Sequence, residues 1–404
     1  MGKGAFSGVK VLEFAWVIAG PRQTAYLADQ GATVVRIESK HALDTLRSGV
    51  YYKENIRHPD RAMSFASQNV NRMSISLNLK HPKGIDIAKK LIAWADVVTE
   101  NFSPGQMEKW GLSYEEIQKI NPSAIYLRAS ILGQTGPYAK HPGYGILANA
   151  ISGITALTGW PDRIPATPFG GYSDALLPRL GAVALLAALV HRKKTGRGQC
   201  LEISQLEAVI HFITPVVLDY LTNGVTWEKQ GNRSPYLAPH NAYRCKGEDR
   251  WCAIAVGSDE EWEGFKKALG DPPWAEKPYF ATLQGRKKHE EELDVLIEGV
   301  TRDEEAEEVM EKMQSEDVPA YVVLNIADVF SDPQFKHRSF FWLTKHPLCG
   351  DIYAYGQPFS LSKSPFELRM PAPCLGEHTD QVCAELLKMP PREIEALKSE
   401  GVFE

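Results

Sequence analysis

The sequence lacks the features that mark secreted, membrane-spanning and zinc-binding proteins. Its 404 residues include only six cysteines, and no two of them form a C-x-x-C pair. Scattered thiols favour a reducing compartment and argue against a structural zinc site. No uninterrupted apolar run reaches about 18 residues, and the first residues lack the apolar core of a signal peptide. We therefore expect a soluble, cytoplasmic protein that does not engage a membrane.

Strong net charge and the common catalytic motifs are absent as well. The formal net charge of -5 gives no reason to expect a nucleic acid as partner. The sequence has no P-loop, no G-x-S-x-G nucleophile elbow and no H-E-x-x-H motif. Its eleven histidines show no ligand spacing, so no metal site is predicted. A G-x-G-x-x-G fingerprint is also missing, which leaves dinucleotide binding with little support.

The first half of the chain alternates between strand and helix patterns. Residues 9–14 form a predicted strand, which is followed by a Gly-Pro turn, a helix (RQTAYLADQ) and a second strand at 33–38. This βαβ unit favours a parallel sheet. Further strands are expected at 74–77, 96–99, 124–130 and 200–204. The pattern predicts an open, Rossmann-like α/β sheet whose ligands lie beyond the carboxyl ends of the strands.

Two segments depart from this alternation. Residues 39–69 are polar and irregular, and we expect them to form a long surface excursion. Residues 223–240 are rich in Pro and Asn, and strands and charged amphipathic helices of a different kind follow. We therefore expect a large α/β domain over residues 1–222, a smaller α+β domain over 241–332 and a C-terminal tail over 333–404.

The stretch FGGYSDALLPRLGAVALLAALVHRKKTGRGQ holds a single acidic residue, Asp174. It stands just before an apolar segment, residues 180–190, which contains no charge and is predicted to be a buried core helix. Asp is a favoured residue at the start of a helix, so Asp174 could be a simple N-cap. Burial beside the helix could equally make its carboxylate reactive. The spacing leaves both interpretations open.

Two other places could contact a ligand. The segment 101–109 combines the flat ring of Phe102 with the cation of Lys109, as a nucleotide-carrying ligand would require. His240 follows a proline in a loop and could also touch a ligand. Packing of the aromatic ring and a locally bonded histidine are the alternative interpretations, and the residues alone do not exclude them.

A set of motifs extends over nearly the whole chain, namely LEFAWVIAGP, GATVVRIE, NRMSISLNLKHPKG, ADVVTENFSPG, the GQTGPY loop, SDALL…AALVHRKKTGRGQ and VPAYVVLNIADVFSDPQF. In sequence and in order, these motifs resemble those of family III CoA-transferases. The family includes formyl-CoA:oxalate, carnitine and benzylsuccinate CoA-transferases and is similar to the α-methylacyl-CoA racemases. The resemblance implies an interlocked dimer, of two copies or with a related chain. It also implies that the tail returns to the large domain.

The resemblance also implies site residues. Asp174 matches the catalytic aspartate of the family. Positions that line the CoA site in relatives are matched by Val17, Leu77, Lys80, Asn101, Phe102, Lys109 and Tyr144. Lys109 stands where relatives often have Arg, which keeps the charge but loses the bidentate fork for phosphate. No cofactor is implied beyond CoA and acyl-CoA as substrate.

The implied reaction moves CoA from an acyl-CoA to a carboxylic acid through aspartyl anhydride and aspartyl-CoA thioester intermediates. The sequence as a whole resembles the subunits of benzylsuccinate CoA-transferase, an enzyme of anaerobic aromatic degradation. This resemblance implies succinyl-CoA as donor and an aromatic succinate such as benzylsuccinate as acceptor. Gly145 stands where several members have an acid or amide, and Ile18 where the formyl-CoA enzyme has glutamine. These changes remove polar groups and favour an apolar acyl group.

Two alternatives remain. An α-methylacyl-CoA racemase needs an acid-base residue on each face of the α-carbon. The loop that carries a His-Asp pair in racemases is PGYG here, residues 142–145, and has no base. The other alternative is a non-catalytic CoA-binding subunit of a heteromeric CoA-transferase, against which the retained Asp174 argues.

Overall fold

The computed structural model describes residues 4–49 and 51–404. The chain divides into two compact units. Unit 1 consists of Met1–Thr155, Thr167–Thr226 and Lys336–Glu404, and unit 2 consists of Ala156–Ala166 and Trp227–Phe335. No feature of the sequence indicated that residues 156–166 would join unit 2.

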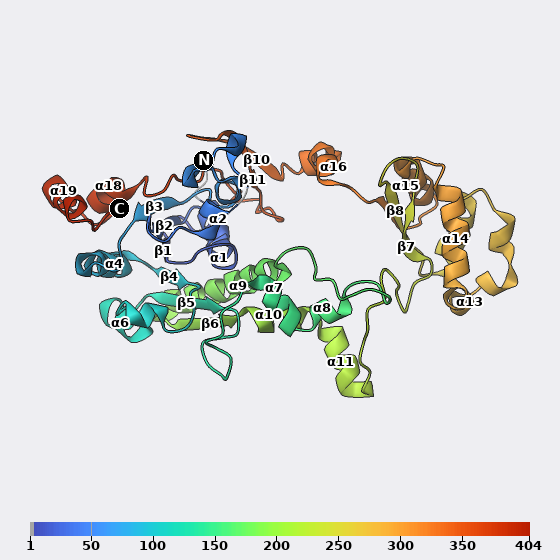
Figure 1. The fold of residues 1–404 in the computed structure, drawn as a ribbon, viewed down its shortest axis with the longest axis horizontal. Helices are drawn as coiled ribbons and strands as arrows, with labels where there is room; N and C mark the ends of the chain where they lie inside the picture. Colours follow the sequence, from blue (N-terminus) through green and yellow to red (C-terminus); the bar gives the residue numbers. More distant parts are fainter. Residues whose placement is uncertain (1–3, 50) are drawn as a thin grey trace. The chain divides into compact units, whose positions relative to one another are not determined.

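Unit 1 is built on a six-stranded, all-parallel sheet with the order β3-β2-β1-β4-β5-β6 (Figure 1). The strands are β1 (Lys10–Glu13), β2 (Thr33–Glu38), β3 (Met73–Ser76), β4 (Val97–Glu100), β5 (Ile125–Ser130) and β6 (Cys200–Ser204). The open α/β sheet expected from the sequence is therefore confirmed. β2 and β6 have the predicted bounds, and the other strands differ by one residue at one or both ends.

The order of the strands reverses at the centre of the sheet. Val11 of β1 pairs with Val34 of β2 on one side and with Val97 of β4 on the other. The chain therefore runs outward from β1 to β3 and then returns to start again at β4. In open α/β sheets, such a switch point leaves a crevice beyond the carboxyl ends of the two central strands.

Helices cover both faces of this sheet. Alternate residues of a strand point to opposite faces. Leu12 packs with helices α4, α6 and α19, whereas Val11 packs with α1 and α9. The helices of unit 1 that cover the sheet or follow its strands are α1 (Ala19–Asp29), α4 (Pro82–Trp94), α5 (Gln106–Lys109), α6 (Tyr114–Ile120), α7 (Gly145–Ile151), α9 (Tyr172–Thr195), α10 (Gln205–Phe212), α11 (Thr214–Asn223) and α19 (Pro391–Ser399).

Helix α9 differs in part from the buried core helix that was predicted for residues 180–190. Leu185 and Ala188 lie in the core, but Val183 on the other face is 63% exposed. Leu180, Leu186 and Val190 are exposed as well, so burial is restricted to one face. Among the described residues, α9 is the one helix long and apolar enough to cross a membrane by length and composition. A proline within it and its packed face are compatible with a core helix.

The predicted surface excursion at residues 39–69 is exposed only in part. Asp44 and Arg47 are 2% and 1% exposed, and Phe65 packs in a small core beside them. Two short helices, α2 (Thr45–Ser48) and α3 (Met63–Ala66), organise the segment. Arg47 pairs with Glu38 at the end of β2, at 2.7 Å. Because these charges neutralise one another, a polar segment can be buried here without leaving an unpaired ion.

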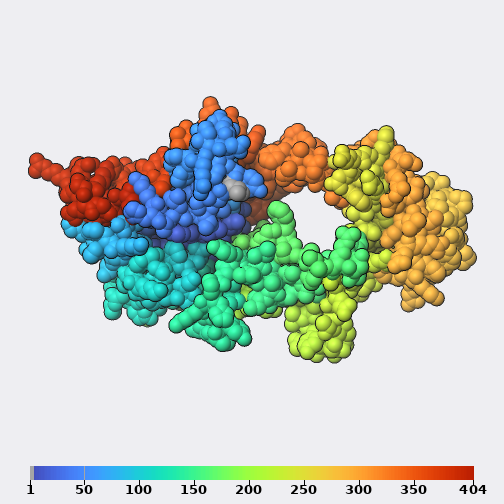
Figure 2. Space-filling view, in the orientation of Figure 1, coloured from blue at the N-terminus to red at the C-terminus, as the bar shows by residue number. Residues whose placement is uncertain are grey.

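The last residues of the chain complete the core of unit 1. The hairpin of β10 (Phe341–His346) and β11 (Gly350–Tyr355) precedes α18 (Thr379–Gln381), a π-helical turn (Val382–Leu386) and α19. Val402 is fully buried, and its carbonyl accepts a hydrogen bond from the N–H of Asn78 at 2.9 Å. Figure 2 shows these C-terminal residues (red) packed against the blue N-terminal part of the unit.

Unit 2 has a three-stranded antiparallel sheet of order β7-β8-β9 and its own core. Its strands are β7 (His240–Arg244), β8 (Trp251–Ala255) and β9 (Ala320–Val322). Its helices are α12 (Asp259–Ala268), α13 (Leu283–Lys288), α14 (Glu290–Thr301), α15 (Ala306–Ser315) and α16 (Ile326–Ser331). Two short helices, α8 (Ile154–Leu157) and α17 (Pro333–His337), lie where the chain passes from one unit to the other.

Candidate active site

The two central strands are joined at their carboxyl ends by one asparagine. Asn101 follows β4, and its Oδ1 accepts a hydrogen bond from the N–H of Trp16, which follows β1, at 2.7 Å. Its Nδ2 donates to the carbonyl of Trp16 at 2.9 Å. These two hydrogen bonds fix the two loops to each other at the switch point of the sheet, where a ligand is expected.

The next residue, Val17, has an unusual backbone. Its φ is +64°, a left-handed conformation that costs a β-branched residue on the order of 1–3 kcal/mol. The N–H of Val17 donates to Oδ2 of Asp44 at 2.9 Å, and the same carboxylate pairs with the buried Arg36. Asp44 therefore holds Val17 in place against this strain, which is the kind of backbone found at ligand-binding sites.

A cavity of about 160 Å³ lies directly beyond this loop. Four of the predicted site residues, namely Val17, Asn101, Tyr144 and Asp174, come together in it. The remaining lining residues are Ala19, Ala129, Ser130, Ile131, Gly143, Gly145, Leu177 and Gln205. The wall is mostly apolar, and Asp174 is its one ionisable carboxylate.

Asp174 is not the N-cap of its helix. The N-cap of α9 is Gly171, so Asp174 is the third helical residue. Its Oδ1 accepts a hydrogen bond from Nε2 of Gln205 at 2.6 Å. Burial raises the pKa of Asp174 above its ordinary value, and the hydrogen bond from Gln205 opposes this increase. The carboxylate is therefore partly desolvated, and its position inside the helix excludes the N-cap role.

Two glycines make room for this carboxylate. A Cβ added to Gly145 would stand 2.3 Å from Oδ2 of Asp174, and one added to Gly171 would stand 2.0 Å from the same atom. Ser173 Oγ donates to the carbonyl of Gly145 at 2.8 Å, which ties α7 to the start of α9. Gly145 therefore has a steric role that the sequence did not reveal.

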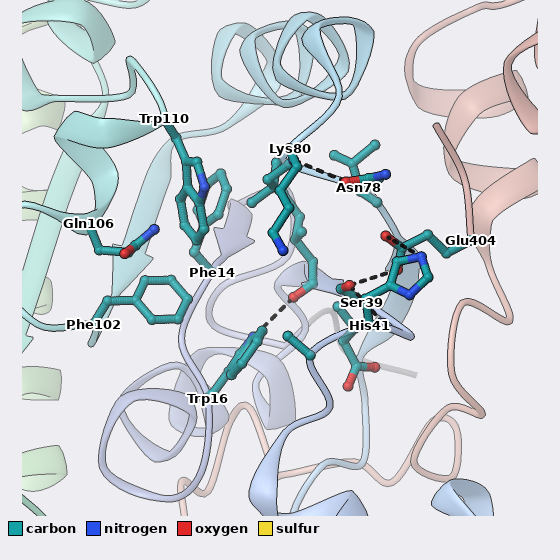
Figure 3. Close-up of a pocket in the computed structure, with 15 residues that line it drawn as sticks. Phe14, Trp16, Ser39, His41, Asn78, Lys80, Phe102, Gln106, Trp110 and Glu404 are labelled. Atoms are coloured by element: carbon teal, nitrogen blue, oxygen red, sulfur yellow. Dashed lines mark hydrogen bonds and ion pairs between the residues drawn. The ribbon is translucent and has the colours of Figure 1, made fainter. Parts of the chain in front are cut away.

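A second cavity, of about 200 Å³, lies beyond the ends of β1, β2 and β3 (Figure 3). Leu77, Lys80 and Phe102 of the predicted set line it. In Figure 3 the side chain of Lys80 points between an aromatic wall and a polar wall. The other residues that line this cavity are Phe14, Trp16, Ile37, Glu38, Ser39, His41, Ala42, Asn78, Leu79, Gln106, Trp110 and Glu404.

The two walls of this cavity have different chemistry. The Phe102 ring meets the rings of Trp16 and Trp110 edge-on, each with a centroid distance of 5.4 Å. On the opposite side, Oε2 of Glu404 accepts hydrogen bonds from Ser39 Oγ at 2.7 Å and from the N–H of Lys40 at 2.6 Å. Flat aromatic surface beside a lysine cation suits a base and a phosphate of one ligand.

Residues that are adjacent in the chain line the two cavities. Val17 and Asn101 face the cavity of Asp174, whereas Trp16 and Phe102 face the cavity of Lys80. A ligand that filled both would be elongated, with a nucleotide-like end at the aromatic wall and a reactive end beside the carboxylate.

Two of the residues considered from the sequence lie elsewhere. Lys109 is exposed in the last turn of α5 and lines neither cavity. His240 begins β7 in unit 2 and lines a separate cavity there.

Several site residues escaped the sequence analysis. Trp16, Trp110, Gln205 and Glu404 were not singled out. Gln205 could have been found, because it directly follows the correctly predicted strand β6, and ligands gather at the carboxyl ends of parallel strands. Trp16 and Trp110 adjoin residues that were predicted. Glu404 reaches its cavity only through the tertiary fold.

Comparison with known proteins identifies the class to which this site belongs. The family model described as CoA-transferase family III matches residues 6–379. The chain belongs to CoA-transferase family III, and it is therefore an enzyme that transfers CoA. This confirms the resemblance seen in the sequence motifs.

Named relatives are similar over nearly their whole length. The chain is 33% identical to succinyl-CoA–D-citramalate CoA-transferase of Chloroflexus aurantiacus, covering 98% of this chain and 97% of the relative. It is 32% identical to the beta subunit of succinyl-CoA–L-malate CoA-transferase of the same organism, covering 98% of each. The crystal structure of a CaiB/BaiF family protein from Brucella suis matches with a TM-score of 0.87 and 30% identity, over 95% of this chain and 100% of that one.

Proposed function

We propose that this chain transfers CoA from succinyl-CoA to a dicarboxylic acid, with Asp174 as the nucleophile. The proposal is supported by the position of the Asp174 carboxylate. This carboxylate is partly desolvated in the cavity at the switch point, and the second cavity, which suits a nucleotide, lies beside it. The names of the relatives support succinyl-CoA as donor, since the citramalate and malate enzymes and a human relative named succinyl-CoA:glutarate CoA-transferase carry it in their names.

The proposed reaction begins at Oδ2 of Asp174. This oxygen attacks the thioester carbonyl, a C–O bond forms, and the C–S bond breaks to release CoA thiolate and leave a mixed anhydride. The thiolate then attacks Cγ of Asp174, forming the aspartyl-CoA thioester and expelling the donor acid, which leaves with Oδ2. The acceptor carboxylate attacks Cγ in turn and expels the thiolate. The thiolate finally attacks the acceptor carbonyl and frees the aspartate.

This series of reaction steps needs no cofactor beyond CoA, because each step exchanges one activated acyl bond for another. Water competes with it, since anhydrides and thioesters hydrolyse. An apolar wall around Asp174, contributed by residues such as Leu177 and Ile131, would limit the access of water.

The size of the Asp174 cavity limits the acyl group. A cavity of roughly 150 Å³ can hold one benzene ring, and this one measures about 160 Å³. A short dicarboxylate or a single aromatic ring would fill it. Citramalate, malate and glutarate are therefore the first acceptors to test. Benzylsuccinate tests the preference for an apolar group that Gly145 and Ile18 suggest.

We further propose that the enzyme works in the reducing cytoplasm as an interlocked dimer, of two copies or with a related chain. All six cysteines are free thiols. Val183 of α9 and Leu221 of α11 are among the exposed apolar side chains of unit 1, at 63% and 72%. Such surfaces mark contacts with another chain. One relative is named as a beta subunit, which supports a heteromeric assembly as the second form.

The test measures CoA transfer from succinyl-CoA to each acid by the purified chain, with Asp174→Asn as the matched variant. We expect transfer by the native chain and a loss of at least about 10³-fold in the variant, because the amide is a poor nucleophile. Borohydride treatment during turnover, followed by mass spectrometry, should locate the modified residue at Asp174. An unmodified Asp174 in a preparation that transfers CoA would contradict the proposal.

A further inference from the structure

We propose that Gln205 is a second catalytic residue. Its amide donates a hydrogen bond to Oδ1 of Asp174, the oxygen that becomes negative in each attack on Cγ. Oδ2 is then the oxygen that leaves with the donor acid and is replaced by an oxygen of the acceptor. This inference rests on the proposed function and assigns a role within its mechanism.

The geometry distinguishes the two oxygens of the carboxylate. Gln205 is the first residue of α10 and is 4% exposed. Its Nε2 donates to Asp174 Oδ1 at 2.6 Å and to Ser173 Oγ at 2.9 Å. Both N–H groups of the amide are therefore engaged, so rotation of the amide would break both bonds. Oδ2 lies instead toward the Cα atoms of Gly145 and Gly171.

The chain around Gln205 keeps this amide in place. Ser204 ends β6 as the N-cap of α10, and its Oγ accepts from the N–H of Glu207. The N–H of Leu206 donates to the carbonyl of Ile131 at 2.9 Å, which anchors the first turn of α10 to the loop after β5. The donor is thus mounted on a helix start fixed to the sheet, as a preorganised oxyanion site requires.

The chemistry uses this donor twice in a cycle. When thiolate attacks Cγ of the mixed anhydride, a C–S bond forms and the carbonyl electron pair moves to Oδ1. The pair returns as the bond from Cγ to Oδ2 breaks and the donor acid leaves. When the acceptor carboxylate attacks the thioester, a C–O bond forms, the pair again moves to Oδ1, and its return expels thiolate. Oδ1 stays on the enzyme throughout.

The hydrogen bond should be strongest in these transition states. In the anhydride and in the thioester, Oδ1 is a neutral carbonyl oxygen, and it gains a full charge in the tetrahedral species. An interaction that strengthens as charge develops accelerates the step, whereas one of constant strength does not. Removing one such donor typically lowers kcat by about 10²- to 10³-fold.

The test compares Gln205→Met with a matched control, Gln23→Met. Methionine keeps the length of glutamine but has no N–H donor. Gln23 of α1 is also buried, and its Nε2 donates to the carbonyl of Ala19 at 3.1 Å, but it lines neither cavity. Rapid quenching with radiolabelled succinyl-CoA measures how fast enzyme-bound CoA appears on Asp174. Steady-state assays give kcat and KM.

We expect Gln205→Met to lower kcat and the rate of aspartyl-CoA formation by about 10²-fold or more, with the KM for succinyl-CoA within about threefold of native. Gln23→Met should match the native chain. Formation of aspartyl-CoA by Gln205→Met at the native rate would overturn the inference and leave the proposed function standing. Absence of any aspartyl-CoA in the native chain would instead refute the proposed function.

A second variant, Gln205→Glu, covers the case in which the methionine variant does not fold. Glutamate keeps the shape of glutamine but donates a hydrogen bond only when protonated. Its activity relative to native should therefore rise as the pH is lowered. A ratio that stays constant across pH would show that Gln205 acts only through packing.

Discussion

Replacing Gly145 by alanine tests the steric argument at the candidate nucleophile. The new Cβ would stand 2.3 Å from Oδ2 of Asp174 and 2.6 Å from its Cγ, whereas ordinary contact begins at 3.4 Å. The carboxylate would have to move by about 1 Å, the difference between 3.4 and 2.3 Å. A misplacement of about 1 Å costs on the order of 10²-fold in rate, which corresponds to about 2.7 kcal/mol of activation free energy.

The fold should tolerate this change. Gly145 is the first residue of α7, where alanine has the higher helix propensity by about 1 kcal/mol. Gly299 in α14 provides the control, because nothing lies within 4 Å of its added Cβ. We expect Gly145→Ala to lose about 10²-fold in kcat with an unchanged Tm, and Gly299→Ala to keep full activity. A Gly145→Ala enzyme within threefold of native kcat would refute the reasoning.

Three further predictions concern the residues that support the site. Burial raises the pKa of Glu100 to about 7 from 4.5, so the folded state loses about 3 kcal/mol of stability as pH rises through this range. Urea unfolding at several pH values should show this decline in the native chain and not in Glu100→Gln. Asp44→Asn should cost about 3 kcal/mol in the free energy of unfolding, because it removes one carboxylate partner of the buried Arg36, and an unchanged urea midpoint would contradict this. Phe102→Leu should weaken CoA binding, measured by calorimetry, by about 1 kcal/mol, and unaltered affinity would exclude stacking on this ring.

Much of the local structure follows from the sequence because its signals are local. The alternation of strand and helix patterns placed β2 and β6 at their observed bounds, since a short run bounded by turn and helix signals marks a strand wherever it occurs. The start of α4 is equally local in the structure, because His81 is its N-cap and Pro82 its first residue.

The same local signals failed where burial depended on distant partners. Residues 39–69 are polar in sequence but buried in part, because Asp44 and Arg47 meet Arg36 and Glu38 of β2. Charge pairing of this kind cannot be seen in composition, since it requires that the segment fold back on the strand.

The sequence by itself determined the family, the parallel sheet and the acid at the head of α9, because motifs, periodicity and one isolated carboxylate are properties of short stretches. Only the tertiary structure decided which groups surround that acid. Gln205 and Gly145 meet Asp174 across 31 and 29 residues of chain, and Glu404 reaches Ser39 across 365. Contacts at such separations depend on how the strands are ordered in the sheet, and no local pattern encodes that order.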